Sequence, residues 1–162
     1  MRIVGIDPGY AIVGYGAVDF AGNRFKTVDF GAVTTQAGTP FEQRLLAIDR
    51  ELTAFFEKTR PEAVAIEKLF FNSNQKTAID VAQARGVIVA AAARLGIPIF
   101  EYTPLQVKMA VVGYGRAEKK QVMEMTRIIL GFDKVPKPDD TADALAIAIC
   151  HAHTSSSLMS VR

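Results

Sequence analysis

Two short apolar runs, each ending on an acidic residue, constrain the fold of this chain most strongly. RIVGID ends on Asp7, directly before Pro8-Gly9, and AVAIE ends on Glu67. A nearly continuous apolar run of this length is typical of a central strand covered on both faces. If the two runs are parallel strands, their carboxyl ends are adjacent, where open α/β sheets place their functional sites. A turn residue at Asp7 and a surface acid at Glu67 are the simpler alternatives.

The rest of the first half predicts a hairpin followed by a helix. The runs IVGYGAVDF and RFKTVDFGAVTT are separated by Ala21-Gly22-Asn23, which favours a tight turn, so the chain opens as a three-stranded meander. Apolar residues then recur at helical spacing over 41–56, and Pro61 ends that helix before the strand EAVAIE.

The second half predicts helices around one further strand. We expect a helix over 75–95, a strand at IPIFEY, and helices over 104–112, 117–130 and 139–153. Strands joined by a helical crossover indicate an α/β fold with a five-stranded mixed sheet flanked by helices. We expect one domain over 1–153 and a flexible C-terminal tail over 154–162.

The composition limits the class of protein. The chain has 162 residues, of which 49% are hydrophobic and 22% charged, and this fits a globular domain. The longest strongly apolar stretch, near 87–93, is far shorter than the roughly 20 residues that span a bilayer, and we find no signal-peptide pattern. We therefore expect a cytoplasmic protein without a membrane segment. The single cysteine, Cys150, lies in an apolar helical run, which indicates a buried side chain without a chemical role.

Positive charge is concentrated in the middle of the chain. Residues 61–137 contain 11 Lys and Arg against 7 Asp and Glu, whereas residues 138–162 contain 1 against 3. A basic segment of this density fits a polyanionic partner. On charge alone, an ordinary solvated surface is the alternative.

A second pair of acids begins the last predicted helix. In KPDDTADALAIAI, Asp140 and Asp143 are three residues apart and therefore share a helix face. Asp139 and Asp143 share a face as well, so spacing does not choose between Asp139 and Asp140. Acids in a first turn also cap free amides, which is the structural alternative. Together with Asp7 and Glu67, this pair allows four carboxylates to converge on one site.

Four carboxylates in one cleft require cations or protons. Two carboxylates about 4 Å apart repel by about 4 kcal/mol at an effective dielectric constant of about 20. Oxygen ligands without His or Cys select Mg²⁺ or Mn²⁺. Two such ions about 4 Å apart stabilise both the attacking water and the leaving oxygen of a phosphodiester. The acids therefore indicate metal-dependent phosphodiester hydrolysis.

Longer motifs resemble one family. The segments IDPGYAIVGYG, AIEKLFFNSN with QARG, VKMAVVGYGRAEKKQV and DDTADALAIAICH are similar to the RuvC family of Holliday-junction resolvases, in the same order and over nearly the whole chain. The resemblance implies a ribonuclease-H-like fold, a homodimer, and paired nicking of four-way DNA junctions with two Mg²⁺ ions per active site, for which Mn²⁺ can substitute. It also implies a short T-rich cutting site and cooperation with a branch-migration complex in recombination and repair. In the family pattern the catalytic and metal-binding positions fall on Asp7, Glu67, Asp140 and Asp143, which selects Asp140 over Asp139.

The same resemblance implies contacts to DNA. Phe70 falls where the family places an aromatic residue that stacks on junction bases, an interaction worth about 1–3 kcal/mol per base, and a core phenylalanine is the alternative. Lys108 and Lys119 fall on positions near the scissile phosphate. Four further cations are candidates for contacts to the DNA backbone, namely Lys76, Arg85, Arg116 and Lys120. The support for them is weaker, because exposed cations are common on helices.

Two of the predicted helices carry further features. The helix over 75–95 is apolar around most of its circumference, which predicts that a second subunit covers the side away from the sheet in a C2 dimer. His151 and His153 lie about two turns beyond Asp143, too far along the last helix for the site, and are expected to be structural.

Two other functions are compatible with parts of the sequence. A glycine-rich turn after a strand-ending acid also occurs in actin-like ATPases and sugar kinases, where it binds phosphate. Those enzymes hold the nucleotide between two such domains, and this chain has the length of one. A junction-binding module without catalysis is the other alternative, and the presence of all four acids argues against it.

Overall fold

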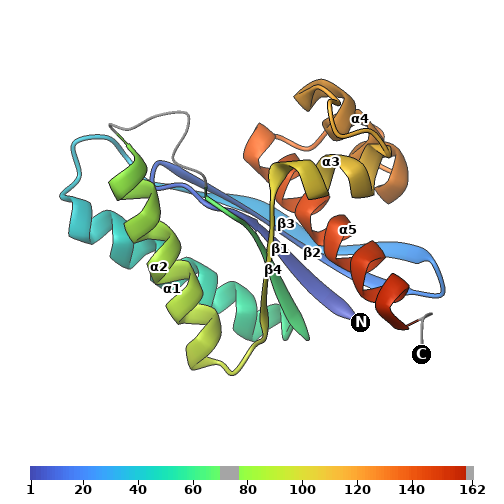
Figure 1. Cartoon of the computed structure of the whole chain (residues 1–162). Helices are drawn as coiled ribbons and strands as arrows, with labels where there is room; N and C mark the ends of the chain where they lie inside the picture. Colours follow the sequence, from blue (N-terminus) through green and yellow to red (C-terminus); the bar gives the residue numbers. More distant parts are fainter. Residues whose placement is uncertain (70–76, 160–162) are drawn as a thin grey trace.

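The computed structural model describes residues 1–69 and 77–159, and this part contains one five-stranded sheet (Figure 1). The strand order is β3-β2-β1-β4-β5, in which the β3–β2 and β2–β1 pairs are antiparallel and the β1–β4 and β4–β5 pairs are parallel. The predicted mixed sheet is therefore confirmed. Its strands are β1 (Arg2–Asp7), β2 (Ile12–Ala21), β3 (Arg24–Thr34), β4 (Ala63–Glu67) and β5 (Ile99–Tyr102).

The turn between β2 and β3 confirms the predicted hairpin. Gly22 has φ of 53° and Asn23 has φ of 62°, so both central residues adopt the left-handed conformation. A two-residue hairpin turn of this kind needs positive φ at both positions, which Gly and Asn adopt more easily than other residues. The local sequence thus determines where the meander turns.

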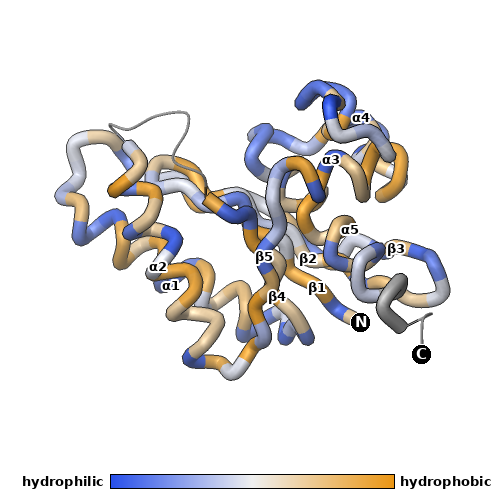
Figure 2. The backbone as a smooth tube through the Cα atoms, in the orientation of Figure 1, coloured by the Kyte–Doolittle hydropathy of each residue, from blue (hydrophilic) through white to orange (hydrophobic). Residues whose placement is uncertain are grey.

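Helices cover both faces of the sheet (Figure 1). One face carries α1 (Phe41–Thr59) and α2 (Ala78–Arg94), and the other carries α5 (Asp139–Met159), against which α3 (Pro104–Val112) and α4 (Lys119–Leu130) pack. Figure 2 shows hydrophobic stretches of β1 and β4 between these two layers. Within the described part of the chain, no helix has both the length and the hydropathy that a membrane span needs.

The core has two halves, one on each face of the sheet. Successive side chains of a strand point to opposite faces. Accordingly, Val4 and Ile6 pack in the half formed with α1 and α2, whereas Ile3 packs in the half formed with α5. The same alternation directs Asp7, two residues after Gly5, to the α5 face.

Three helix boundaries differ from the sequence-based expectation. The α1 helix continues past Phe56 to its last residue, Thr59. Arg60 caps it in the left-handed conformation, with φ of 48°. The α4 helix begins at Lys119, because Glu118 forms a capping box with Gln121. The α2 helix begins at Ala78 in the described part, and the expected start at residue 75 lies outside it.

The largest difference lies at the end of the chain, where α5 replaces the start of the expected tail. The helix continues to Met159 instead of ending at residue 153. Thr154 donates a hydrogen bond to the carbonyl oxygen of Cys150 at 2.8 Å, and Ser155 donates one to that of Ala152 at 3.0 Å. These bonds to the preceding turn satisfy the hydroxyl groups within the helix, so a polar sequence can extend it.

Candidate active site

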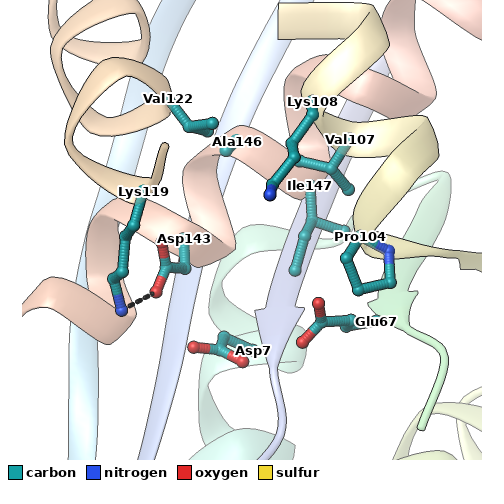
Figure 3. Close-up of a pocket in the computed structure, with 10 residues that line it drawn as sticks. All are labelled: Asp7, Glu67, Pro104, Val107, Lys108, Lys119, Val122, Asp143, Ala146 and Ile147. Atoms are coloured by element: carbon teal, nitrogen blue, oxygen red, sulfur yellow. Dashed lines mark ion pairs between the residues drawn. The ribbon is translucent and has the colours of Figure 1, made fainter. Parts of the chain in front are cut away.

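Asp7 and Glu67 lie side by side at the carboxyl ends of two neighbouring parallel strands. The register pairs Gly5 with Ala65 and Ile6 with Ile66, so the next residues of β1 and β4 are the two acids. Strand alternation places both side chains on the α5 face, and Figure 3 shows both carboxyl groups in the same pocket. The predicted convergence of the two strand ends is therefore present in the fold.

Glycines in the sheet allow α5 to lie directly on it and deliver the remaining acids. A Cβ atom at Gly5 would lie 1.9 Å from the carbonyl oxygen of Ala144, and one at Gly14 would lie 1.9 Å from that of Asp140. No other residue type fits at these positions without moving the helix. The close approach of α5 brings the Asp143 carboxylate to the pocket that contains Asp7 (Figure 3).

The pocket has a volume of about 350 Å³ and combines acids, lysines and an apolar wall. Five elements contribute to it, namely β1, β4, α3, α4 and α5. The residues that line it are Asp7, Glu67, Pro104, Val107, Lys108, Lys119, Val122, Asp143, Ala146 and Ile147. The site thus draws on residues from position 7 to position 147, which meet only in the folded chain.

Burial and mutual repulsion raise the pKa values of the three carboxyl groups in the pocket. Burial raises the pKa of Asp7 to about 8, and the charges of Glu67, Asp143 and Asp140 add to the effect. Burial also raises the pKa of Glu67 and of Asp143, each with a further contribution from a neighbouring acid. Asp7 therefore holds a proton near neutral pH unless a cation replaces it.

Asp140 lies one helical turn before Asp143 and does not line the pocket. Its charge nevertheless raises the pKa of both Asp7 and Asp143. Asp139, by contrast, forms an ion pair with Lys137 at 2.5 Å, and the hydrogen bond from Lys137 lowers the pKa of Asp139. The charge of Asp139 also raises the pKa of Asp143, and the choice of Asp140 over Asp139 stays a prediction.

Two lysines bring positive charge to the acids. The Lys119 ammonium lies 2.6 Å from a carboxylate oxygen of Asp143. Burial alone would lower the pKa of Lys119, but the hydrogen bond with Asp143 and the charges of Asp143, Asp7 and Asp139 outweigh it, so the pKa is raised. Lys108 extends from α3 into the same pocket (Figure 3).

The carboxylates do not form a closed ligand cage by themselves. Among residues 1–69 and 77–159, no group of three or more His, Cys, Asp or Glu side chains is close enough to hold a metal ion. Like charges repel, and Lys119 holds Asp143 by an ion pair. The donor chemistry still fits a hard divalent cation, because buried carboxylates with raised pKa values gain most from such a charge.

The other predicted DNA contacts are placed differently. Arg85 is mostly buried and forms an ion pair with Glu101 at 3.0 Å, while its Nε donates to the carbonyl oxygen of Glu67 at 3.5 Å. This environment indicates support of the end of β4, and DNA contact by Arg85 stays a prediction. Arg116 and Lys120 are exposed beside the pocket, near the start of α4. The remaining candidates, Phe70 and Lys76, lie outside the described residues.

A clamp on the turn after Asp7 was not predicted from the sequence. The guanidinium of Arg44 lies 4.7 Å from the centroid of the Tyr10 ring, and its Nε donates to the hydroxyl of Thr35 at 2.8 Å. That hydroxyl donates in turn to the carbonyl oxygen of Tyr10. The three residues tie the turn to α1 and to the end of β3, and only the tertiary fold brings them together.

The two histidines lie away from the acidic pocket, as expected. His151 is buried, its Nδ1 lies 2.7 Å from the hydroxyl of Tyr102, and its ring packs on Phe100 at 4.4 Å between centroids. His153 packs against Phe25, with 5.6 Å between the ring centroids. Cys150 is buried too, and burial raises the pKa of its thiol to about 11, which leaves the group protonated.

Comparison with known proteins identifies the family. Residues 3–151 match the family described as "Crossover junction endodeoxyribonuclease RuvC". This chain belongs to that family. It is 58% identical to the RuvC of Ruminiclostridium cellulolyticum over 154 residues, which cover 95% of this chain and 93% of the relative.

Solved RuvC structures share the whole architecture. Thermus thermophilus RuvC is 37% identical to this chain and superposes with a TM-score of 0.91. The match covers 97% of this chain and 96% of the Thermus chain. The same protein in complex with a Holliday junction substrate is 35% identical, with a TM-score of 0.89 and the same coverage. The expected ribonuclease-H-like fold is thereby confirmed. The match to RuvC favours junction resolution over the alternative of an actin-like ATPase or sugar kinase.

Proposed function

We propose that this chain resolves four-way DNA junctions by paired nicks, as a metal-dependent endonuclease of recombination and repair. The observation that carries the proposal is the meeting of Asp7, Glu67 and Asp143 in one pocket with two lysines, in a chain that belongs to the RuvC family. A relative of the same fold binds a Holliday junction substrate, which supports this choice of substrate. The site residues and their order in the sequence agree with hydrolysis of a phosphodiester.

Asp7, Glu67, Asp140 and Asp143 are the residues that would hold the metal. Their oxygen atoms fit Mg²⁺, and Mn²⁺ as a substitute, and four carboxylates provide enough negative charge for two ions. Metal ions held by these acids would activate the attacking water and offset the charge on the leaving oxygen. The raised pKa of Asp7, about 8, means that cation binding at neutral pH releases protons from the site.

The other residues of the pocket bind and orient the scissile strand. Lys119 and Lys108 place two positive charges beside the acids, where they attract a phosphate and offset the negative charge that develops on it. Val107, Val122 and Ile147 form an apolar wall that limits water at the reacting phosphate. Phe70 is the proposed aromatic contact to junction bases, and Lys76 is a further backbone contact.

Paired nicking requires two sites, and the exposed face of α2 supports a homodimer. Ala84, Ile88 and Ala91 are buried against the sheet side, whereas Ile79 is 68% exposed on the opposite side. Exposed small residues continue this outer face at positions 82, 86, 90 and 93, and Figure 2 shows hydrophobic residues along the helix. A C2 dimer through this face would present two acidic pockets to one junction.

Three further parts of the proposal rest on the family alone. We propose a short T-rich cutting site, cooperation with a branch-migration complex, and a cytoplasmic location where the protein meets DNA. The absence of a membrane-spanning helix in the described residues is compatible with this location.

The decisive experiment compares a synthetic four-way junction with a linear duplex of the same sequence. We expect symmetric nicks in two opposed strands of the junction with Mg²⁺, and none in the duplex. Binding without cutting, in either Mg²⁺ or Mn²⁺, would instead support a junction-binding module without catalysis. Equal cutting of both substrates would contradict selectivity for the junction.

A further inference from the structure

The turn between α3 and α4, two helices that contribute to the acidic pocket, carries an exposed aromatic side chain. This α3–α4 turn, residues 113–118, joins the two helices that contribute Lys108 and Lys119 to the pocket. Tyr114 lies near its start and is 56% exposed. Within residues 1–69 and 77–159, its hydroxyl forms no hydrogen bond and its ring contacts no other aromatic ring. An exposed tyrosine without a partner is available for a ligand.

The backbone of the α3–α4 turn is held at both ends. Gly113 ends α3 in the left-handed conformation, with φ of 78°, and its N–H donates to the carbonyl oxygen of Met109 at 3.0 Å. The N–H of Ala117 donates to the carbonyl oxygen of Tyr114 at 3.1 Å, and Ala117 is buried. Glu118 then begins α4 with a capping box. The backbone position of Tyr114 is thus set before any ligand binds, which lowers the entropic cost of ordering the turn on binding.

We define the apolar patch as Leu105, Met109 and Tyr114, three exposed residues of α3 and the turn that follows it. Gly115, the residue after Tyr114, lies against the other two side chains of the patch. A Cβ at this position would lie 2.5 Å from a side-chain carbon of Leu105 and 3.5 Å from the sulfur of Met109. The turn therefore rests on the outer face of α3. Exposed apolar groups gathered in this way mark an interaction surface more often than isolated ones do.

The charges around the apolar patch favour nucleic acid over protein as its partner. Arg116 on the same turn and Lys120 on the first turn of α4 are exposed, as is one acid of the turn, Glu118, whose side chain takes part in the capping box of α4. An aromatic ring flanked by cations matches a nucleic acid strand, which offers flat bases and a line of phosphates. The patch belongs to the segment 61–137, whose excess of Lys and Arg over Asp and Glu has the sign of charge that attracts such a strand.

We propose that Tyr114 is a DNA contact outside the acidic pocket. Its ring stacks on a base or a deoxyribose exposed where the arms of the junction diverge, while Arg116 and Lys120 bind the neighbouring phosphates. This inference rests on the proposed function. It names a surface that would orient the strand leading into the pocket, beyond the acids and lysines that line it.

The chain contains no tryptophan, which provides a direct test. Tyr114→Trp creates a single-tryptophan protein, whose emission we expect to be quenched by a four-way junction in EDTA, at the concentration where wild type binds. Ile128→Trp is the matched control, since Ile128 is 54% exposed on the second half of α4. Its emission should change little. Stacking on a base quenches indole emission only where the ring touches DNA.

A second measurement separates stacking from charge. Tyr114→Ala should weaken junction binding about fivefold or more, whereas Tyr114→Phe keeps the ring and should bind like wild type. The slope of the logarithm of the binding constant against the logarithm of salt concentration reports the number of phosphate contacts. Arg116→Ala should reduce the size of this slope by about 1, and Tyr114→Ala should leave it unchanged. The melting temperature of Tyr114→Ala should match wild type, because the side chain is exposed.

The outcomes distinguish this inference from the proposed function. If wild type binds the junction but Trp emission at position 114 is unchanged and Tyr114→Ala binds normally, Tyr114 does not contact DNA and the inference is overturned. If wild type itself does not bind the junction, the proposed function is overturned. Quenching of the Trp emission at position 114, together with weaker junction binding by Tyr114→Ala, supports both the inference and the junction binding that the proposed function requires.

Discussion

The ammonium group of Lys119 lies 2.6 Å from a carboxylate oxygen of Asp143, so a residue of α4 neutralises a residue of α5 inside the acidic pocket. The lysine side chain is more than half exposed, whereas that of Asp143 is mostly buried. Solvent screens an ion pair of this kind, so its contribution to the free energy of unfolding is small. Its importance lies in the charge that it brings to a site crowded with acids.

We therefore expect Lys119→Met to affect cutting far more than stability. Loss of a cation that offsets developing charge reduces turnover by about 100-fold or more. The melting temperature should stay close to wild type. Lys120→Met is the control, because Lys120 is a neighbouring exposed cation that does not line the pocket. Equal losses of cutting in the two variants would mean that Lys119 acts as an ordinary phosphate contact.

Asp7→Asn should abolish cutting and preserve binding. The change keeps the shape of the side chain and removes a charge that the metal needs. Affinity for the junction comes mainly from Lys and Arg contacts to phosphates, so binding measured in Ca²⁺ should be equal or tighter. Asp139→Asn, next to the site but paired with Lys137, should nick normally in Mg²⁺. Near-normal nicking by Asp7→Asn would contradict the two-metal proposal.

The pKa of Asp7 also predicts how stability depends on pH without metal. The pKa rises from 3.8 to about 8 on folding, so between these values the folded state keeps a proton that the unfolded state releases. Stability therefore falls as pH increases through this window. In EDTA, the melting temperature of Asp7→Asn should fall less than that of wild type between about pH 5 and 8. Asp139→Asn should keep the wild-type slope, because its pKa is lowered and it titrates below this range.

Gly14→Ala should damage both the fold and the site. The added Cβ would lie 1.9 Å from the carbonyl oxygen of Asp140, so α5 must move away from β2. Overpacking of this kind costs about 1–3 kcal/mol of stability, and cutting should fall because Asp140 and Asp143 move with the helix. Gly86→Ala is the control for the fold of the single chain, since an added Cβ there meets nothing within 4 Å, and light scattering on this variant checks the dimer separately, because position 86 lies on the outer face of α2. A Gly14→Ala protein with wild-type melting and cutting would show that α5 tolerates the shift.

Ile79→Glu should convert a dimer into a monomer. Ile79 is 68% exposed on the outer face of α2, and a charge buried in a dimer interface without a partner destabilises it strongly. Light scattering at micromolar concentration should show a dimer for wild type and a monomer for the variant. Val28→Glu, at an exposed position on β3, should remain dimeric. A monomeric wild type would contradict the proposed assembly.

The sequence by itself determined the features that depend on neighbours along the chain. The run RIVGID predicts a buried strand, and period-two alternation places Asp7 on the same face as Gly5. Glu67 follows Ala65 in β4 in the same way, so parallel pairing alone brings the two acids together. The hairpin at Gly22 and Asn23 and the helix that starts at Pro104 were predictable for the same reason.

The tertiary structure decided what depends on distant segments. Spacing left Asp139 and Asp140 equivalent, whereas in the folded chain the charge of Asp140 acts on Asp7 and Asp139 is paired with Lys137. The fold also pairs Lys119 with Asp143, which belong to different helices. Local patterns define the face on which a side chain lies, whereas its partners depend on where each helix crosses the sheet. That crossing is set by side-chain volumes over the whole interface, including two positions where only glycine leaves room for a helix backbone.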